Sequence, residues 1–405
     1  YCECGKQRMS LWRDSAWSSG AKGLCIVWKI LHARKSKGCV HGERNRRSMC
    51  YRVSLWKEFV GVMVMMNTAD CPTGNCPPSE LLSENRIKLS EGSGGTEMAR
   101  LIQQIRGRIS NKGDWNHTLS DSAILSKKVD NIVFTTDSYV VTPLFFPGGN
   151  IGKIAFCGTV NDLVVMGAQP LGLSLGVIAE EGLPKDTFFE IMDTIGGLSE
   201  EYDIPIATGD TKVMERRSVD KLILNTSGVG TAEKRLVAPL EIGDKIIVSG
   251  GIGEHAATLL ACRFELETEL MTDSQPLIHE MNVIRPYIKQ ARDITRGGLA
   301  AILNEWIQNT GKGINVVEEA IPLRQEVKAL TDILGMDPHA LACEGRMAVV
   351  CSPENSEAVV TALKKFNPLA SEIGEVTPDN MVTVQTVLGK KRMPMPSGIL
   401  TPRIC

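Results

Sequence analysis

Five aspartates stand beside strongly apolar stretches of this 405-residue chain. They are Asp121 in "LSDSAIL", Asp137 in "FTTDSYV", Asp162 in "TVNDLVV", Asp210 in "ATGDTKV" and Asp293 in "RDITRGGL". Singly, an aspartate in such a place is usually a turn residue or a helix cap. As a group they favour metal binding, because carboxylates beside apolar sequence are costly unless something neutralises them. Mg²⁺ fits this pattern, since it binds one or two carboxylates together with substrate phosphates.

Two glycine-rich turns indicate contact with phosphate. Gly92, Ser93, Gly94 and Gly95 in "EGSGGTEM" precede a helical pattern, and glycines let backbone N–H groups approach phosphate oxygens at a helix start. The turn has no Gly-Lys-Ser/Thr and is therefore not a Walker A motif. In the second turn, "SGGIGEHAA", His255 is either an ordinary polar residue at a helix start or a ligand contact.

Three further residues could do chemistry. Lys212, just after Asp210-Thr211, is either an exposed strand-end lysine or a point charge for a phosphate or an activated carbonyl. Glu344 in "ACEGRMAV" is either structural or a base whose pKa a partly apolar setting would raise. Cys405 ends the chain behind "TPRI", where a thiol contributes nothing to a core. We expect a flexible arm to carry it elsewhere.

Strand and helix patterns alternate after residue 85. We expect a strand in "NIVFTTDSYVV", a helix and then a strand in "KIAFCGTVNDLVVMGAQPLGLSLGVIAEEG", and a helix in "KDTFFEIMDTIGGLSEEYDIP". A second unit begins at "GDKIIVSGG", with a helix in "DITRGGLAAILNEWI" whose start Asp293 marks and a strand in "ACEGRMAVVCS". The pattern predicts an α/β (or α+β) fold in two domains, residues 86–235 and 236–388, followed by an irregular, flexible tail, residues 389–405.

Residues 1–85 differ in composition and in hydrophobic pattern from the rest of the chain. They are basic and Trp-rich, show no sustained helix or strand period, and begin with Tyr rather than Met. We expect an extraneous or disordered extension there. The alternative is a metal site built from "CEC" and "CPTGNC", but these lack the paired spacing of zinc ligands.

Composition excludes several classes of protein. A net charge of −2 is untypical of a nucleic-acid binder. No stretch reaches the roughly 20 apolar residues of a membrane span, and we expect no membrane partner. The later cysteines are scattered without pair spacing, which indicates a reduced, cytoplasmic protein.

The motifs together resemble one family. "VVTPLFFPGGNIGK", "TGDTKV", "GGIGEH", "DITRGGLAAILNE", "ACEGRM" and the terminal "PRIC" are similar to those of the HypE carbamoyl dehydratases of hydrogenase maturation, within the PurM-like ATP-binding superfamily. The resemblance covers about residues 86–405. It implies a two-domain fold in a homodimer, whose N-terminal sheets pair into a β-barrel with ATP at the subunit boundary.

The resemblance also implies a reaction. A partner carbamoyltransferase loads a carbamoyl group onto the Cys405 thiol, and ATP activates the carboxamide oxygen. Dehydration leaves a thiocyanate, and the cyano group passes to iron on a scaffold complex as a cyanide ligand of [NiFe]-hydrogenase. By the same resemblance Glu344 is the base, Lys212 orients or polarises the carbamoyl group, and the loop from Gly92 to Gly95 closes over phosphate. The acids of Mg²⁺–ATP are Asp137, Asp162, Asp210 and Asp293, with Asp121 a weaker candidate.

Two alternatives remain open from the sequence. One is another PurM-like enzyme that uses ATP, a small-molecule kinase or a synthetase, which has no use for a terminal thiol. The other is a non-catalytic nucleotide-binding scaffold, against which the presence of Lys212 and Glu344 speaks. We expect no lipid anchor on Cys405, because prenylation needs three residues after the cysteine.

Overall fold

The computed structural model describes residues 85–88, 91, 95–109, 115–116, 124–125, 131–234 and 236–396. All of these belong to one compact unit, residues 79–405. The expectations for residues 1–84 lie outside the described residues. So do those for Gly92, Ser93, Gly94, Asp121 and Cys405, which stay predictions.

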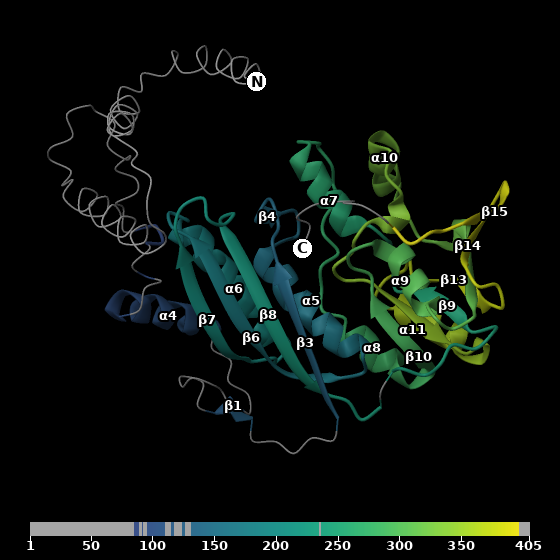
Figure 1. Ribbon diagram of the computed structural model, residues 1–405, viewed down its shortest axis with the longest axis horizontal. Helices are drawn as coiled ribbons and strands as arrows, with labels where there is room; N and C mark the ends of the chain where they lie inside the picture. The colour runs from purple at the N-terminus through teal and green to yellow at the C-terminus, as the bar shows by residue number, and fades with distance from the viewer. Residues whose placement is uncertain are drawn as a thin grey trace, which may run out of the picture. The chain divides into compact units, whose positions relative to one another are not determined.

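A four-stranded sheet forms the N-terminal half, in the order β3-β8-β6-β7 (Figure 1). Its neighbours are antiparallel except β6 and β7, which run parallel. A parallel pair needs a long crossover, and α6 supplies it. The bounds are β3 Ile132–Tyr139, β6 Gln169–Glu180, β7 Ile206–Met214, β8 Leu222–Thr231 and α6 Lys185–Glu201. In one chain the described strands of this sheet do not close into a barrel.

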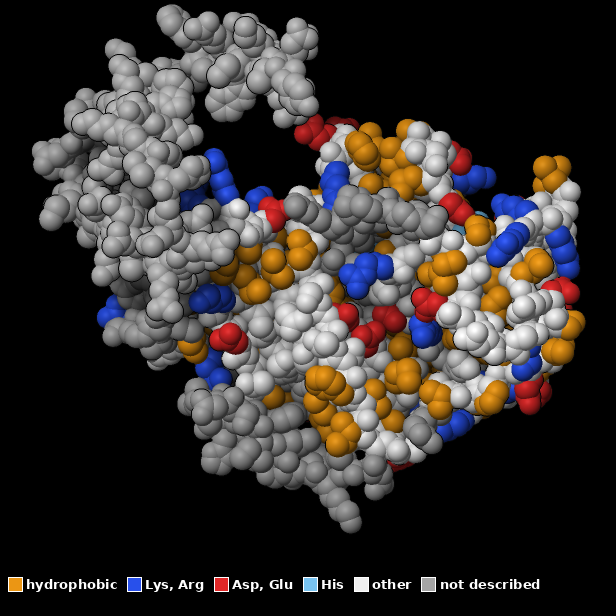
Figure 2. All heavy atoms as spheres, in the orientation of Figure 1, with side chains coloured by type: hydrophobic (Ala, Val, Ile, Leu, Met, Phe, Trp, Pro, Cys, Tyr) orange, Lys and Arg blue, Asp and Glu red, His pale blue; other side chains and the backbone are white. Residues whose placement is uncertain are grey.

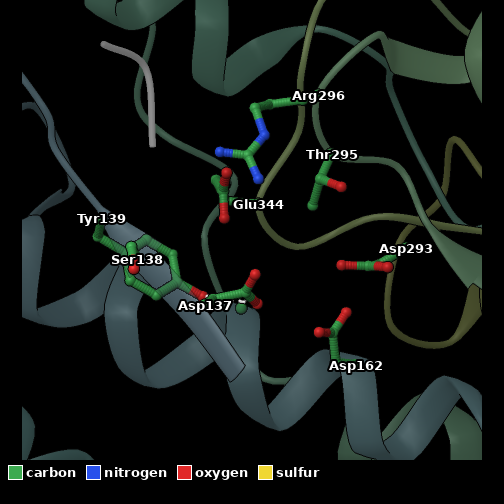
Figure 3. A pocket seen from close by; sticks show the side chains of 9 residues that line it. Asp137, Ser138, Tyr139, Asp162, Asp293, Thr295, Arg296 and Glu344 are labelled. Atoms are coloured by element: carbon green, nitrogen blue, oxygen red, sulfur yellow. Dashed lines mark hydrogen bonds between the residues drawn. The ribbon is translucent and has the colours of Figure 1, made fainter. Parts of the chain in front are cut away.

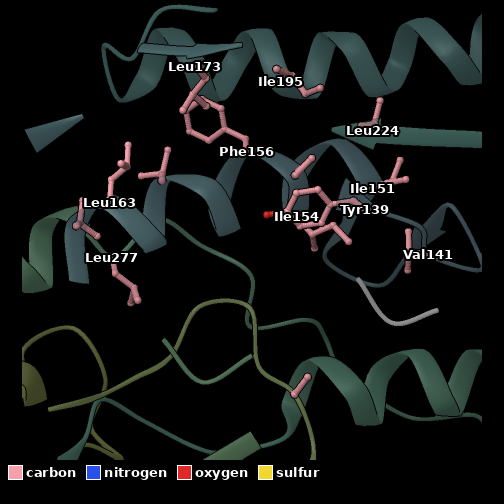
Figure 4. Packing of buried hydrophobic residues seen from close by; sticks show 14 of the residues in the cluster. Tyr139, Val141, Ile151, Ile154, Phe156, Leu163, Leu173, Ile195, Leu224 and Leu277 are labelled. Carbon is pink, nitrogen blue, oxygen red and sulfur yellow. The ribbon is translucent and has the colours of Figure 1, made fainter. Parts of the chain in front are cut away.

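Helix α5 (Ile151–Val165) is the centre of the N-terminal core. The Asn150 side chain caps its start by accepting from the backbone N–H groups of Gly152 and Lys153. All its residues are buried except Lys153 and Asp162, because the sheet, α6 and the C-terminal half enclose it (Figure 4). A carboxylate on so apolar a helix needs a special environment. The remaining N-terminal elements are α4 Gly95–Ile109, β1 Trp115–Asn116, β2 Ile124–Leu125, β4 Phe145–Phe146 and β5 Gly149–Asn150.

A seven-stranded sheet forms the C-terminal half, in the order β10-β12-β9-β13-β11-β14-β15. Its strands are β9 Lys245–Val248, β10 Ile288–Asp293, β11 Gly313–Val317, β12 Met347–Cys351, β13 Ser371–Thr377, β14 Val382–Thr386 and β15 Gly389–Arg392. Its helices are α7 Glu254–Arg263, α8 Ile278–Ile284, α9 Gly298–Ile307, α10 Gln325–Leu334 and α11 Ser356–Lys364. The strand-and-helix alternation predicted from the sequence is therefore present in both halves.

Two local predictions are wrong. Asp293 does not mark the start of a helix, because it pairs with Met347 as the last residue of β10 and α9 begins only at Gly298. Residues 389–392 are not an irregular tail, because they form β15, which pairs with β14. Met393 is then buried in the C-terminal core, so the described chain is fixed to this point.

One face of the N-terminal sheet carries no helix from the described part of the chain. Side chains of β3 alternate between exposed and partly buried positions, and Ile132 and Phe134 are each 66% exposed. Figure 2 shows apolar side chains on the surface around the start of this strand. None of the helices in the described ranges is long and apolar enough to cross a membrane. The described cysteines, Cys157, Cys262, Cys343 and Cys351, are all free.

Candidate active site

A small acidic pocket lies where the two halves meet (Figure 3). Its volume is about 60 Å³, which can hold only a small part of a nucleotide. Figure 2 shows acidic side chains with basic ones near the middle of the visible face. The pocket is lined by Asp137, Ser138, Tyr139, Gly158, Asp162, Asp293, Thr295, Arg296 and Glu344.

The N-terminal half contributes two of the predicted acids. Asp137 comes from the side of β3 that faces α5, and Asp162 is one of the two residues of α5 that are not fully buried. Thr135 Oγ1 donates to Asp162 Oδ2 at 2.6 Å, which ties strand and helix together beside the pocket. The Tyr139 hydroxyl lies over Gly158, where an added Cβ would be only 2.3 Å from it. The glycine in "FCGTVND" therefore makes room for this wall.

The C-terminal half contributes Asp293 and Glu344. Antiparallel pairing of β10 with β12 sets Asp293 opposite Met347. The ladder continues past the strand ends, because the backbone N–H of Ile294 donates to the Arg346 carbonyl and that of Cys343 to the Ile294 carbonyl. This register brings two acids that are far apart in the sequence to one end of the sheet.

Burial makes these carboxyl groups harder to ionise. It raises the pKa of Asp162 to about 6, with the nearby Asp137 adding to the rise and the Thr135 hydrogen bond opposing it. Burial and the charge of Asp162 raise the pKa of Asp293 to about 7. For Glu344, burial and the charges of Asp273 and Asp293 raise the pKa well above its usual range, and Arg296 opposes this. Such perturbed groups cluster at functional sites.

Glu344 has the environment expected of a base. Its side chain is 3% exposed, and its Oε1 atom has no hydrogen-bond partner within the described residues. In Figure 3 its carboxyl group lies next to the guanidinium of Arg296. A buried carboxylate with an oxygen that accepts no hydrogen bond is a stronger base toward a substrate N–H, because fewer interactions stabilise its charge.

The donor set suits a hard cation. Asp137, Asp162 and Asp293 all offer carboxylate oxygens to the same pocket, and burial raises the pKa of Asp162 and of Asp293 because their negative charge is poorly compensated there. Within the described ranges no three His, Cys, Asp or Glu side chains already form a metal cage. Mg²⁺ takes most of its ligands from water and phosphate, so a pocket that held it would need to supply only one or two carboxylates.

Three predicted residues lie elsewhere. Asp210 and Lys212 are on β7, in register with Gly176 and Ile178 of β6, and both are exposed on the face of the sheet away from α5. Alternation along the strand turns Thr211 inward instead. His255 is fully buried at the start of α7, where its Nδ1 atom lies 2.7 Å from Thr272 Oγ1 and its ring meets the edge of Phe146.

Arg296 is the main pocket residue that the sequence reasoning missed. It stands inside the motif "RDITRGGL", three residues after Asp293, and its guanidinium faces the acids. Of the residues that line the pocket, it is the one cation. Four acids in one pocket, one of them buried, call for a positive charge, so this arginine within the same motif is a usable signal.

Comparisons with known proteins agree with this geometry. Family models for the AIR synthase related protein match residues 119–232 with its N-terminal domain and residues 241–387 with its C-terminal domain. The carbamoyl dehydratase HypE of Rhizobium leguminosarum bv. viciae is 40% identical over 339 residues, 80% of this chain and 96% of that relative. The chain belongs to the HypE carbamoyl dehydratase family. The expected family and its two-domain α/β fold are thereby confirmed.

Solved structures of HypE proteins extend the match. A HypE structure in complex with ATP superposes with a TM-score of 0.74 at 35% identity, over 78% of this chain and 99% of that one. HypE in a complex with HypF superposes with a TM-score of 0.63 at 34% identity, over 75% of this chain and 100% of that one. Membership of the HypE family therefore describes this chain better than a small-molecule kinase or a non-catalytic scaffold does.

The buried charge of Asp162 should reduce stability. A carboxyl group whose pKa is raised on folding favours the folded state fully below its unfolded pKa near 4, and that contribution is lost as pH rises through about 6. Asp162→Asn should therefore raise the free energy of unfolding at pH 8 by about 1–3 kcal/mol without Mg²⁺ or nucleotide.

Denaturant unfolding at pH 4 and pH 8 tests this. At pH 4 most of the gain should vanish, because the carboxyl is then protonated in the folded state and about half protonated in the unfolded state. Asp332→Asn, on the exposed side of α10, is the control and should change little at either pH. A loss of stability at pH 8 in Asp162→Asn would contradict the account of the pocket.

Proposed function

We propose that this chain dehydrates a carbamoyl group carried on Cys405 to a thiocyanate, with ATP as the activating substrate. The main support for this proposal is the pocket, in which the buried Glu344 faces three aspartates and Arg296. Such a site combines a base, a place for phosphate with its cation, and low exposure to water. Family membership supports the same reaction.

The reaction needs ATP because a carboxamide oxygen is a poor leaving group. The oxygen attacks the γ-phosphorus, the bond from that phosphorus to ADP breaks, and Glu344 accepts one N–H proton as the C=N bond forms. The C–O bond then breaks, phosphate leaves with the electron pair and the second N–H proton is released, which completes C≡N. Arg296 is placed to hold the negative charge of the transferred phosphoryl group.

The cation would be held by pocket carboxylates. We propose that Asp137, Asp162 and Asp293 bind Mg²⁺ together with the ATP phosphates, and that the bound ion supplies neutralisation of phosphate charge. The relative solved with ATP supports nucleotide binding here. Because the cavity is small, only the terminal phosphate and the carbamoyl group need to enter it. The Gly92–Gly95 loop remains our candidate for covering the phosphates.

A second copy of the chain would explain the residues that lie outside the pocket. We propose that the open face of the N-terminal sheet pairs with the same face of a partner to complete the expected β-barrel. Exposed Ile132 and Phe134 support this, since isolated sheet faces of this kind are normally covered. Asp210 and Lys212 project from the same face and would then lie at the subunit boundary, where ATP is expected.

The chain would work with other maturation proteins. We propose a carbamoyltransferase as the donor to Cys405 and an iron-carrying scaffold complex as the acceptor of the cyano group. The relative solved with HypF supports a protein partner of the first kind. The free described cysteines support the expected cytoplasmic location.

Glu344→Gln should stall the reaction after loading. Removing a positioned base costs about 10²–10⁴-fold in rate, while ATP binding should persist. Mass spectrometry of the C-terminal peptide follows the outcome: the wild type should gain a carbamoyl group and then lose one water, whereas Glu344→Gln should keep the carbamoyl group. Cys405→Ser should not gain the carbamoyl group, because it lacks the thiol that carries it.

Glu280→Gln is the matched control. Glu280 is also buried with a raised pKa but lies outside the pocket, so its variant should still lose water from the carbamoyl group. Dehydration at the wild-type rate in Glu344→Gln would contradict the role of this residue. Absence of any adduct on the wild type, with an active transferase, would contradict the proposed function.

Phe134→Glu should separate the dimer. A charge on the proposed paired face would have to be desolvated on association, and sedimentation velocity should show the mass of one chain instead of two. Val387→Glu, at an 81% exposed apolar position of the β14–β15 turn, is the control and should stay dimeric. A wild type that sediments as a monomer at high concentration would refute pairing of the sheets.

A further inference from the structure

The main chain of Glu344 is held from both sides by buried side chains. Its backbone N–H donates to Asp273 Oδ1 at 3.0 Å, and its carbonyl accepts from Asn161 Nδ2 at 3.2 Å. Glu344 lies before β12, so no strand or helix ladder satisfies these two groups. Their partners fix the peptide on which the proposed base is mounted.

Asn161 links the two halves of the molecule. It is 1% exposed on α5, and its amide also donates to the Gln275 carbonyl at 3.1 Å, while its Oδ1 accepts from the Leu277 N–H at 2.8 Å. One side chain thus satisfies three backbone groups of the C-terminal half, two of them in buried hydrogen bonds. Because Asn161 directly precedes Asp162, the same turn of α5 carries a pocket acid and fixes the base.

Asp273 belongs to the segment between α7 and α8 and packs directly against the Glu344–Gly345 backbone. An added Cβ on Gly345 would lie 1.9 Å from the Asp273 carbonyl oxygen, so only glycine permits this approach. Asp273 Oδ2 is also 3.8 Å from Arg346 Nε, and the aspartate side chain is fully buried. The segment that contains Asp273, Gln275 and Leu277 therefore bonds to α5 through Asn161 and to the main chain of Glu344 through Asp273.

We propose that Asn161 and Asp273 are positioning residues that fix the Glu344 main chain relative to α5, so that its carboxyl group reaches the carbamoyl nitrogen beside Asp162. The proposal rests on the dehydratase function stated above. Neither residue touches the reacting atoms. Catalytic groups require such support, since a displacement of about 1 Å can cost about 100-fold in rate.

The first test removes the hydrogen bonds of Asn161. Asn161→Leu keeps the branching and the number of heavy atoms of the side chain but makes none of the three bonds. Full-length chain carrying the carbamoyl group on Cys405 is mixed with saturating Mg–ATP, and loss of water is followed in a single turnover. The rate should fall about 10- to 100-fold, with ATP affinity unchanged.

The control is a variant that weakens the same helix elsewhere. Asn150→Ala removes the cap of α5 and should lower the thermal midpoint while leaving the single-turnover rate at the wild-type value. A purely structural role of Asn161 predicts the same behaviour for Asn161→Leu. An Asn161→Leu rate equal to that of Asn150→Ala would therefore overturn the proposal.

A second test compares two variants of Asp273. It also tests the proposal if Asn161→Leu does not fold. Asp273→Asn keeps an oxygen that can accept from the Glu344 N–H, whereas Asp273→Ala does not, and both remove the charge beside Arg346. The Asn variant should dehydrate at least about tenfold faster than the Ala variant, again with equal ATP affinity. Equal rates would overturn the proposal. A wild type that keeps its carbamoyl group would instead show that the dehydratase function is wrong.

Discussion

The structure depends on the burial of several carboxyl groups in one pocket opposite a single lining cation. Asp162, Asp293 and Glu344 come from a helix, a strand end and the approach to another strand, and burial raises the pKa of each. At neutral pH this arrangement costs stability, since each unit of pKa shift is worth about 1.4 kcal/mol. A fold that keeps such a site has a use for its negative charge, and binding a cation with phosphate is the use that the geometry supports.

Helix α5 contributes both to the hydrophobic core and to the pocket. Its apolar surface is covered by the sheet, by α6 and by the C-terminal half, which leaves little freedom for movement. Asp162 opens into the pocket from this rigid element, and Asn161 next to it bonds to the segments that frame Glu344. The relative positions of a pocket acid from one half and the proposed base from the other therefore depend on neighbouring residues of one helix turn.

Much of the fold could be read from the sequence, because apolar periodicity is a local property. The strands at Asp137 and Asp210 and the helix at Asp162 are where the patterns place them. The matching contexts and the family resemblance predict a group of acids that also includes Asp210. The structure brings Asp137, Asp162 and Asp293 together with Glu344 and leaves Asp210 on β7, outside the pocket. The local sequence predicts that Asp293 starts a helix. It instead ends a strand, because its position is set by pairing with β12, about fifty residues further along the chain.

Other features depend on tertiary contacts that no local pattern reports. Alternation along β7 turns Asp210 and Lys212 away from the pocket of their own chain. Asn161 reads as one polar residue in an apolar helix, and its bond to the Glu344 carbonyl spans 183 residues. No spacing rule reaches that far.

The most direct test of the central claim is a crystal structure of the carbamoyl-loaded chain with Mg²⁺ and a non-hydrolysable ATP analogue. The account predicts that the terminal phosphate, the ion and the carbamoyl group of Cys405 meet in the pocket, with Glu344 in hydrogen-bond reach of the carbamoyl nitrogen and Asp162 or Asp293 bound to the ion. A nucleotide whose terminal phosphate lies away from Asp137, Asp162 and Asp293, or a carbamoyl group out of reach of Glu344, would contradict it.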